Sequence, residues 1–168
     1  MKLRQLEKKD ALMMLEWMQD KSINRFFCFL SEQIDLDSVY KFIDDSINNE
    51  TNKHFAIVDE SDEYMGTVSL KNIDNCNLRG EYAIALRKKA QGKGYAKYAT
   101  KELLRYAFKE RGLNKVYLNV LSYNERAIAF YEKIGFKHEG EFKKHIKKND
   151  KFYDIKWYSF LSEDFDNV

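Results

Sequence analysis

The sequence predicts a single α/β domain, residues 1–168, built on a mixed sheet. Its length suits one domain with a sizeable core. Charged residues make up 33% of the chain and hydrophobic residues 44%, which is typical of a globular protein. The candidate elements follow the order strand, two helices, three strands, helix, strand, helix, two strands. This order lacks the regular alternation of a doubly wound fold.

Two helices follow the first strand candidate, residues 2–6. Asp10 is expected to cap the first helix, and residues 35–47 form the second. Three consecutive strands are expected next. The apolar helix positions are Leu12, Leu15 and Trp17 in the first helix, and Val39, Phe42, Ile43 and Ile47 in the second. The three strands are His54–Val58, Tyr64–Leu70 and Glu81–Leu86.

The second half of the chain begins with the clearest helix, residues 95–111, which Gly112 ends in a left-handed cap. A strand over residues 115–121 and a short helix over residues 124–133, stopped by Gly135, come next. Residues 136–146 and 152–161 then predict a long hairpin.

The composition excludes several classes of protein. The formal net charge of +2 is low for a dedicated nucleic-acid binder, and the lysine-rich segment 143–151 is typical of a solvated hairpin end. No apolar run has the length of a membrane span. No secretory signal is present, so Cys28 and Cys76 are expected to be reduced thiols in a cytoplasmic protein.

A glycine-rich turn, Gln91–Ala96 with the sequence QGKGYA, stands between a strand and the clearest helix. The free amides of a helix start and the positive end of its dipole favour an anion, commonly a phosphate. Gly92 and Gly94 let that anion reach the main chain, and Lys93, with Arg87 or Lys97, adds attraction. The pattern is neither a P-loop nor a dinucleotide fingerprint. Taken alone, it is equally consistent with an ordinary tight loop.

The short helix has an unusual face. Asn124, Ala127 or Ile128, and Tyr131 follow helical spacing and share one side. An amide, a small gap and a phenol could flank an extended polar ligand. The alternative is that Tyr131 is a core aromatic residue with its hydroxyl at the surface.

These two segments together resemble the GNAT acetyltransferase superfamily. Gln91-x-x-Gly94-x-Ala96 is similar to its pyrophosphate loop, and Asn124-x-x-Ala127…Tyr131-x-Lys133-x-Gly135-Phe136 to its second signature. The resemblance covers nearly the whole chain. The closing hairpin resembles the branch that holds ribosomal-protein and spermidine N-acetyltransferases. The resemblance to the superfamily implies a mixed, mostly antiparallel, splayed sheet that holds the cofactor between the strands ending near Leu86 and Leu121.

The resemblance also implies a cofactor and the residues that hold it. Acetyl-CoA is the expected cosubstrate, and no metal is expected. Asn124 would hydrogen-bond the pantetheine arm and Tyr131 would lie near the thioester sulfur as general acid. The pyrophosphate would be held by Gln91, Gly92, Lys93, Gly94, Tyr95 and Ala96. The backbone of Ile84, Ala85 and Leu86 would pair with the pantetheine arm, and Ala127 and Lys133 complete the expected cofactor site.

Acetyl transfer to an amine requires a base, because an alkylammonium with a pKa near 10.4 has no lone pair to attack with. Glu81 is the candidate, since strand alternation places it on the face of the small residues Ala83 and Ala85. A salt-bridged strand carboxylate is an equal alternative. A water chain is a further route for the proton. The other candidates are His54, His138 and His145, which are not spaced as a metal site.

The acceptor is left open between a polyamine, an amino-sugar conjugate and a protein N-terminus. The first two helices carry aromatic and acidic residues that would suit a cationic amine, and packing in the core is the alternative for the aromatic ones. A non-catalytic acetyl-CoA-binding module is a rival class. Pairing through the edge of the closing hairpin would give a homodimer. The aromatic and acidic residues expected near the acceptor are Trp17, Phe26, Phe27, Phe29, Glu32, Asp35 and Asp37.

Overall fold

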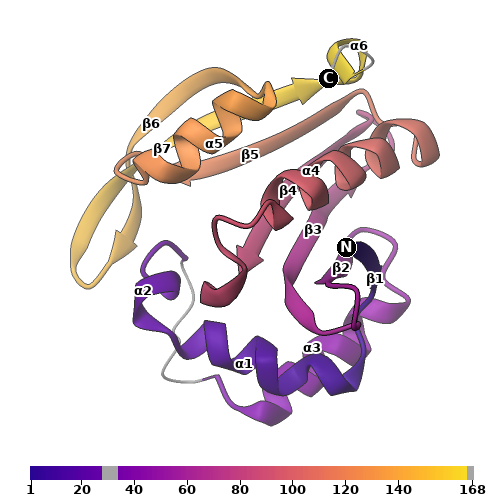
Figure 1. The fold of residues 1–168 in the computed structure, drawn as a ribbon. Coiled ribbons are helices and arrows are strands. Elements are labelled where there is room, and N and C mark those ends of the chain that lie inside the picture. The colour runs from indigo at the N-terminus through magenta and orange to yellow at the C-terminus, as the bar shows by residue number, and fades with distance from the viewer. Residues whose placement is uncertain (28–33, 166–168) are drawn as a thin grey trace.

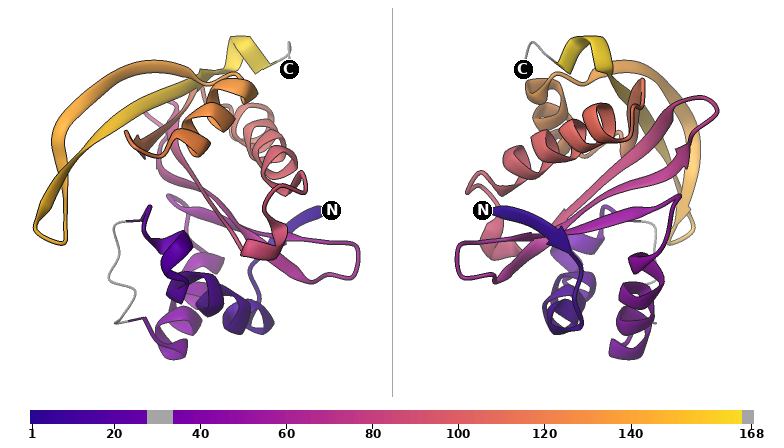
Figure 2. Two further views of the ribbon diagram at one scale, coloured as in Figure 1. Left: turned by 60° about the vertical axis from the view of Figure 1, so that its left-hand side comes forward. Right: turned by 90° about the vertical axis from the view of Figure 1, so that its right-hand side faces the viewer.

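The computed structural model describes residues 1–27 and 34–165, so Cys28, Phe29 and Glu32 lie outside the described residues. Helices cover both faces of one seven-stranded sheet (Figures 1 and 2). The strands are β1 (Lys2–Gln5), β2 (Lys53–Val58), β3 (Tyr64–Asp74), β4 (Arg79–Leu86), β5 (Lys115–Leu121), β6 (Lys137–Lys148) and β7 (Lys151–Leu161). The helices are α1 (Ala11–Gln19), α2 (Lys21–Asn24), α3 (Leu36–Ile47), α4 (Tyr95–Arg105), α5 (Glu125–Ile134) and α6 (Ser162–Phe165).

The sheet has the order β1-β2-β3-β4-β5-β7-β6, and every neighbouring pair is antiparallel except β4 and β5. The predicted mixed, mostly antiparallel sheet of seven strands is therefore confirmed. The prediction of four helices omitted α2 and α6. Each has four residues, which is too short to show helical periodicity.

Helices α1 and α3 pack on one face of the sheet around a buried cluster that includes Met14, Trp17 and Ile43. Two expectations for α1 were wrong. The Asp10 side chain makes no cap hydrogen bond to the helix, because Arg4 holds the carboxylate at 2.7 and 2.8 Å. Leu12 is 67% exposed, because the buried face of α1 is formed by Ala11, Met14 and Trp17 instead.

Helices α4 and α5 lie on the opposite face, over a second buried cluster that includes Leu103, Tyr82 and Phe160. The helix predicted over residues 95–111 is confirmed in position but changes type, because a π-helical turn spans Tyr106–Glu110. Gly112 then adopts a φ of +63°, the left-handed conformation that ends the helix.

Strands β4 and β5 separate part-way along their length, which is the feature that shapes the site (Figure 1). Their parallel pairing covers only three positions and stops at Glu81 opposite Tyr117. Beyond this point β4 remains paired with β3 on its other edge, and β5 with β7. One edge of β4 is therefore left without a strand partner from Tyr82 to Leu86.

Within the described ranges, no helix is long and apolar enough to cross a membrane. Cys76 is an exposed free thiol.

Candidate active site

The free edge of β4 can accept an extended ligand. A strand edge presents unpaired N–H and C=O groups, and such an edge can bind an extended chain as an added strand. Ile84, Ala85 and Leu86 lie on this segment. They are therefore in the position that the pantetheine prediction requires.

The glycine turn follows β4 directly and begins α4. Gly94 is the first residue to accept a helical hydrogen bond, from Tyr98, and it does so with a φ of +87°. Gly92 has a φ of +77°, and no atom lies within 4 Å of the position that its Cβ would occupy. Both glycines thus adopt left-handed backbone conformations and leave the main chain open to close approach. The amides of the first helical turn, which begins at Tyr95 and Ala96, have no partner within the helix. The turn therefore fits a phosphate group.

Side chains around this turn tie it to the rest of the site. Gln91 donates to the Leu86 carbonyl at 3.4 Å and accepts from Arg126 of α5 at 3.1 Å. Lys93 is exposed beside the turn. The attraction expected from Arg87 is not available, because its guanidinium is buried and binds Glu16 at 2.6 Å and Glu63 at 2.9 Å.

Tyr131 connects the two halves of the divided sheet. It belongs to α5, which follows β5, and its ring packs edge-on against Tyr82 of β4 at a centroid distance of 5.9 Å. Tyr131 is 9% exposed, and burial raises the pKa of its hydroxyl well above the usual value. No hydrogen bond among the described residues engages this hydroxyl. It is therefore a protonated phenol that can donate to a ligand.

The remaining residues of the second signature lie along α5, from its N-terminal cap to its end. The Asn124 side-chain oxygen accepts from the Ala127 amide at 3.3 Å and so caps the helix, which leaves the side-chain nitrogen to donate. Ala127 is half-buried, and Lys133 is exposed in the last turn of the helix. Gly135 ends α5 with a φ of +117°, as the sequence predicts.

Glu81 stands where β4 and β5 part. Its carboxylate accepts from Asn72 at 2.7 Å, Lys71 at 3.2 Å and Asn119 at 3.2 Å. Only 14% of the side chain is exposed. A carboxylate has about four lone-pair positions, so three donors leave room for one more. Both predicted roles, proton acceptor and ion-pair partner, are compatible with this geometry.

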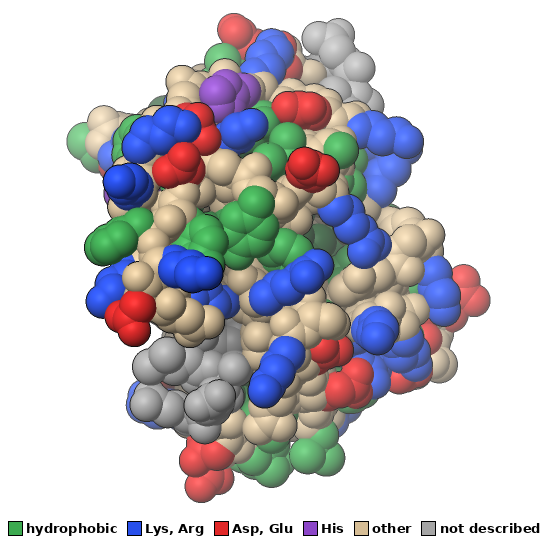
Figure 3. All heavy atoms as spheres, turned by 90° about the vertical axis from the view of Figure 1, so that its left-hand side faces the viewer, with side chains coloured by type: hydrophobic (Ala, Val, Ile, Leu, Met, Phe, Trp, Pro, Cys, Tyr) green, Lys and Arg blue, Asp and Glu red, His purple; other side chains and the backbone are tan. Residues whose placement is uncertain are grey.

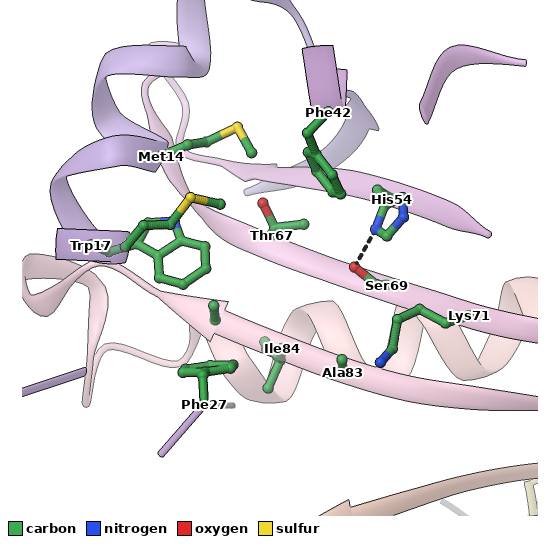
Figure 4. A pocket seen from close by; sticks show the side chains of 12 residues that line it. Met14, Trp17, Phe27, Phe42, His54, Thr67, Ser69, Lys71, Ala83 and Ile84 are labelled. Atoms are coloured by element: carbon green, nitrogen blue, oxygen red, sulfur yellow. Dashed lines mark hydrogen bonds between the residues drawn. The ribbon is translucent and has the colours of Figure 1, made fainter. Parts of the chain in front are cut away.

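A cavity of about 240 Å³ lies beside Glu81, on the sheet face that α1 and α3 cover (Figure 4). Side chains from both helices form one wall and side chains of β2, β3 and β4 form the other. The lining residues are Met14, Trp17, Met18, Phe27, Phe42, His54, Thr67, Ser69, Lys71, Ala83, Ile84 and Ala85. Of the residues expected at the acceptor side, Trp17 and Phe27 are therefore brought to the cavity. Phe26 packs on Tyr123 instead, and Asp35 caps α3.

The three histidines lie in different places. His54 lines the cavity and its Nδ1 lies 2.7 Å from the Ser69 hydroxyl. Burial, with a contribution from Lys71, lowers the pKa of His54 to about 4, which makes it a weak base. His138 and His145 are exposed on β6, against Tyr158 and Phe142. No cluster of three or more metal-ligating side chains occurs among the described residues.

The tip of the β6–β7 hairpin is hydrogen-bonded to the chain at the end of α2. The Lys148 ammonium donates to the carbonyls of Asn24 and Arg25, both at 3.0 Å, and Phe27, at 2.8 Å. Tyr123 adds a hydrogen bond to the Arg25 carbonyl at 3.3 Å. We call residues 24–27 with Lys148 the clasp. It connects the half of the molecule that carries β5–β7 with the helices that wall the cavity.

Comparison with known sequences agrees with this geometry. Residues 1–137 match the profile described as Acetyltransferase (GNAT) domain. The chain belongs to the GNAT acetyltransferase family. It is 33% identical to the spermidine N(1)-acetyltransferase of Escherichia coli K12 over 142 residues, which are 83% of this chain and 74% of that one. It is 34% identical to the putative ribosomal N-acetyltransferase YdaF of Bacillus subtilis over 101 residues, which are 60% and 55% of the two chains.

A solved structure extends the similarity to the whole GNAT fold. The spermidine N-acetyltransferase of Vibrio cholerae in complex with CoA and spermine superimposes with a TM-score of 0.90 at 25% identity, covering 98% of this chain and 96% of that one. The chain is therefore an N-acetyltransferase, an acyltransferase that uses acetyl-CoA.

Sequence reasoning missed several residues of the GNAT site. Thr67, Ser69 and Lys71 line the cavity from β3, and their alternation along the strand was a usable signal for a polar face. Lys148 was grouped with a solvated lysine run. Its three carbonyl partners belong to a segment more than a hundred residues away, and nothing local in the sequence indicates them.

Proposed function

We propose that this GNAT protein transfers the acetyl group of acetyl-CoA directly to the primary amine of a small molecule. The observation that carries the proposal is the parting of β4 and β5 at Glu81. This separation leaves one edge of β4 free. The Glu81 carboxylate lies at this point, the Tyr131 phenol packs on the next residue, Tyr82, and the cavity lined by Lys71 and Ala83 supports an acceptor site. The relatives named as spermidine N-acetyltransferases support a small amine acceptor, with polyamines and amino sugars as the classes to compare.

The chain's own groups have distinct tasks in binding the cosubstrate. Amides of the turn from Gln91 to Ala96 would hold the pyrophosphate, with Lys93 adding positive charge. The edge of β4 from Ile84 to Leu86 would pair with the pantetheine arm, and the Asn124 side-chain nitrogen would donate to it. Ala127 and Lys133 would border it on α5. Bound acetyl-CoA supplies an acetyl group already activated as a thioester.

Proton transfer falls to two residues. Tyr131 keeps its proton because it is buried, so it can donate to the sulfur that leaves. Glu81, with one lone-pair position free, would accept the proton of the incoming ammonium directly or through water. A backbone N–H of β4 beyond Glu81 would polarise the acetyl carbonyl. Holding the amine in line contributes the remaining acceleration.

The acid role is tested with Tyr131→Phe, compared with Tyr158→Phe. Tyr158 is also a buried phenol, and its hydroxyl donates to Glu132. We expect kcat for CoA release to fall about 10²-fold for Tyr131→Phe, with unchanged CoA affinity by calorimetry, and to stay near wild type for Tyr158→Phe. Equal kcat values in both variants would refute the acid role.

The base role is tested with Glu81→Gln, whose amide keeps the size of the side chain. We expect a large loss of kcat/KM for the amine and loss of the pH dependence that the carboxylate imposes. If both the rate and its pH profile persist, Glu81 is only an ion-pair partner and a water chain delivers the proton.

A protein N-terminus is the second candidate acceptor, because YdaF is named as a putative ribosomal N-acetyltransferase. Short peptides in the same CoA-release assay distinguish it from small amines. A chain that binds CoA but releases none with any amine or peptide would be a non-catalytic binding module. Homodimer formation through the hairpin stays a prediction, and sedimentation measures it.

A further inference from the structure

The cavity beside Glu81 is walled mainly by apolar and aromatic side chains. The apolar lining residues are Met14, Trp17 and Met18 of α1, Phe42 of α3, and Phe27. Figure 4 shows Met14, Trp17 and Phe42 extending from the two helices. The cavity volume of about 240 Å³ exceeds the ~150 Å³ that suffice to bind benzene in an apolar protein cavity. The space therefore suits one aromatic ring with a short chain.

The polar groups in this wall already have protein partners. The His54 ring bonds to Ser69 at 2.7 Å, and the Thr67 hydroxyl lies 2.6 Å from the Tyr64 hydroxyl. Burial and Lys71 keep His54 neutral near pH 7 by lowering its pKa to about 4. These pairs stabilise the wall and leave few groups to solvate a charged ligand.

The charge of the wall is unfavourable for a second cation. Among the lining residues that the structure describes, Lys71 is the one with an ionised side chain, and it is positive. Its partner Glu81 lies at the parting of the strands, where the reacting amine is expected. On the molecular face that carries the hairpin tip, hydrophobic side chains gather near the middle, with Lys, Arg, Asp and Glu side chains around them (Figure 3). Among the described lining residues, an ammonium placed beyond Glu81 would meet no counter-charge, which is costly.

We infer that the acceptor is an arylalkylamine, a primary amine on a short chain that ends in an aromatic ring, and that the ring occupies this cavity. The inference rests on the proposed function and specifies its acceptor. The amine lies towards Glu81, and the ring lies between α1, α3 and the sheet. Polyamines and amino sugars are then poorer acceptors, because each brings further charge or hydroxyl groups into an apolar space.

The test compares kcat/KM for CoA release with phenethylamine, spermidine and glucosamine. We expect phenethylamine to exceed both of the others at least tenfold. A spermidine or glucosamine value equal to or above that of phenethylamine would overturn the inference while leaving the proposed function intact. Absence of CoA release with every amine and peptide would overturn both.

Two variants locate the ring. Met18→Glu adds a carboxylate to the wall, and we expect it to lower kcat/KM for phenethylamine at least tenfold and to raise that for spermidine. Leu12→Glu, on the exposed side of the same helix, is the matched control and should leave both unchanged. Indistinguishable values for the two variants would contradict the assignment.

Phe42→Ala covers the case in which Met18→Glu fails to fold. Phe42 packs edge-on against His54 at 4.7 Å, so its removal enlarges the cavity. We expect the ratio of kcat/KM for tryptamine to that for phenethylamine to rise at least fivefold. An unchanged ratio would place the ring elsewhere and overturn the inference.

Discussion

Replacing Lys148 with methionine tests whether the clasp shapes the acceptor cavity. Methionine keeps an unbranched apolar stem but removes the ammonium that binds the carbonyls of Asn24, Arg25 and Phe27. Phe27 also lines the cavity. The variant should therefore loosen one wall of the acceptor site and leave the cofactor side, formed by the β4 edge and the start of α4, unchanged.

The size of the effect follows from these three contacts. Hydrogen bonds that involve a charged group contribute about 1.5–3 kcal/mol each when fully protected from water. The Lys148 side chain is only half-buried, so we take about 2 kcal/mol for the set, within the same range. The Tyr123 hydroxyl still holds Arg25, and its ring still packs on Phe26, so the segment does not detach fully. A loss of about 2 kcal/mol corresponds to roughly 30-fold in the population of the closed wall.

Steady-state CoA release measures this effect, with the amine that gives the highest rate as acceptor. We expect the acceptor KM to rise 10- to 30-fold, while the acetyl-CoA KM changes less than twofold. Lys147→Met is the matched control, because Lys147 is exposed and pairs only locally with Asp150. An unchanged acceptor KM in Lys148→Met, or equal shifts in both constants, would refute the reasoning.

Three further predictions concern the glycine turn, a buried ion pair and pH. Gly94→Ala and Gly112→Ala both force a side chain into a left-handed backbone conformation. Each should lower the unfolding free energy measured in urea by about 1–2 kcal/mol. Only Gly94→Ala should also lose CoA affinity, by tenfold in calorimetry. Arg87→Gln should lower the unfolding free energy by about 1–3 kcal/mol, because it breaks charged hydrogen bonds to Glu16 and Glu63. Folding lowers the pKa of His54 from 6.5 to about 4, so the unfolded chain binds the proton more tightly and stability falls as the pH drops from about 6.5 to 4. Over that pH range the unfolding free energy of His54→Gln should fall by up to about 3 kcal/mol less than that of the wild type, as urea titrations at each pH would measure. The same pH profile in both proteins would contradict the pKa shift.

Much of the fold could be predicted from the sequence because its strands and long helices show clear periodicity and end at strong signals. The strand over residues 115–121 was predicted with its exact bounds, and Gly135 ends α5 as expected. Failures occurred where tertiary contacts override a local preference. Asp10 looks like a helix cap but is bound by Arg4 of β1.

In the candidate site, too, the local motifs were predictable from the sequence and the tertiary contacts were not. The glycine turn and the Asn124–Tyr131 face are local motifs, so the sequence alone could identify them. The cavity wall combines α1, α3 and three strands, and its shape depends on how these pack. Glu81 shows the limit most clearly. The position of Glu81 on its strand was predictable. Its partners Asn72 and Asn119 were not, because they come from two other strands, β3 and β5.

Strand β4 can serve acceptor and cofactor at once because a strand has two faces and an edge. Ala83 and Ala85 line the cavity and Glu81, on the same face, binds the lining residue Lys71, whereas Tyr82 lies on the opposite face against Tyr131. Pairing with β3 fixes this alternation. A slip of one residue would put the phenol of Tyr82 into the cavity and the carboxylate of Glu81 into the apolar cluster under α4. The register of β4 on β3 therefore determines where acetyl transfer can occur, and the parting from β5 determines that a ligand can reach it.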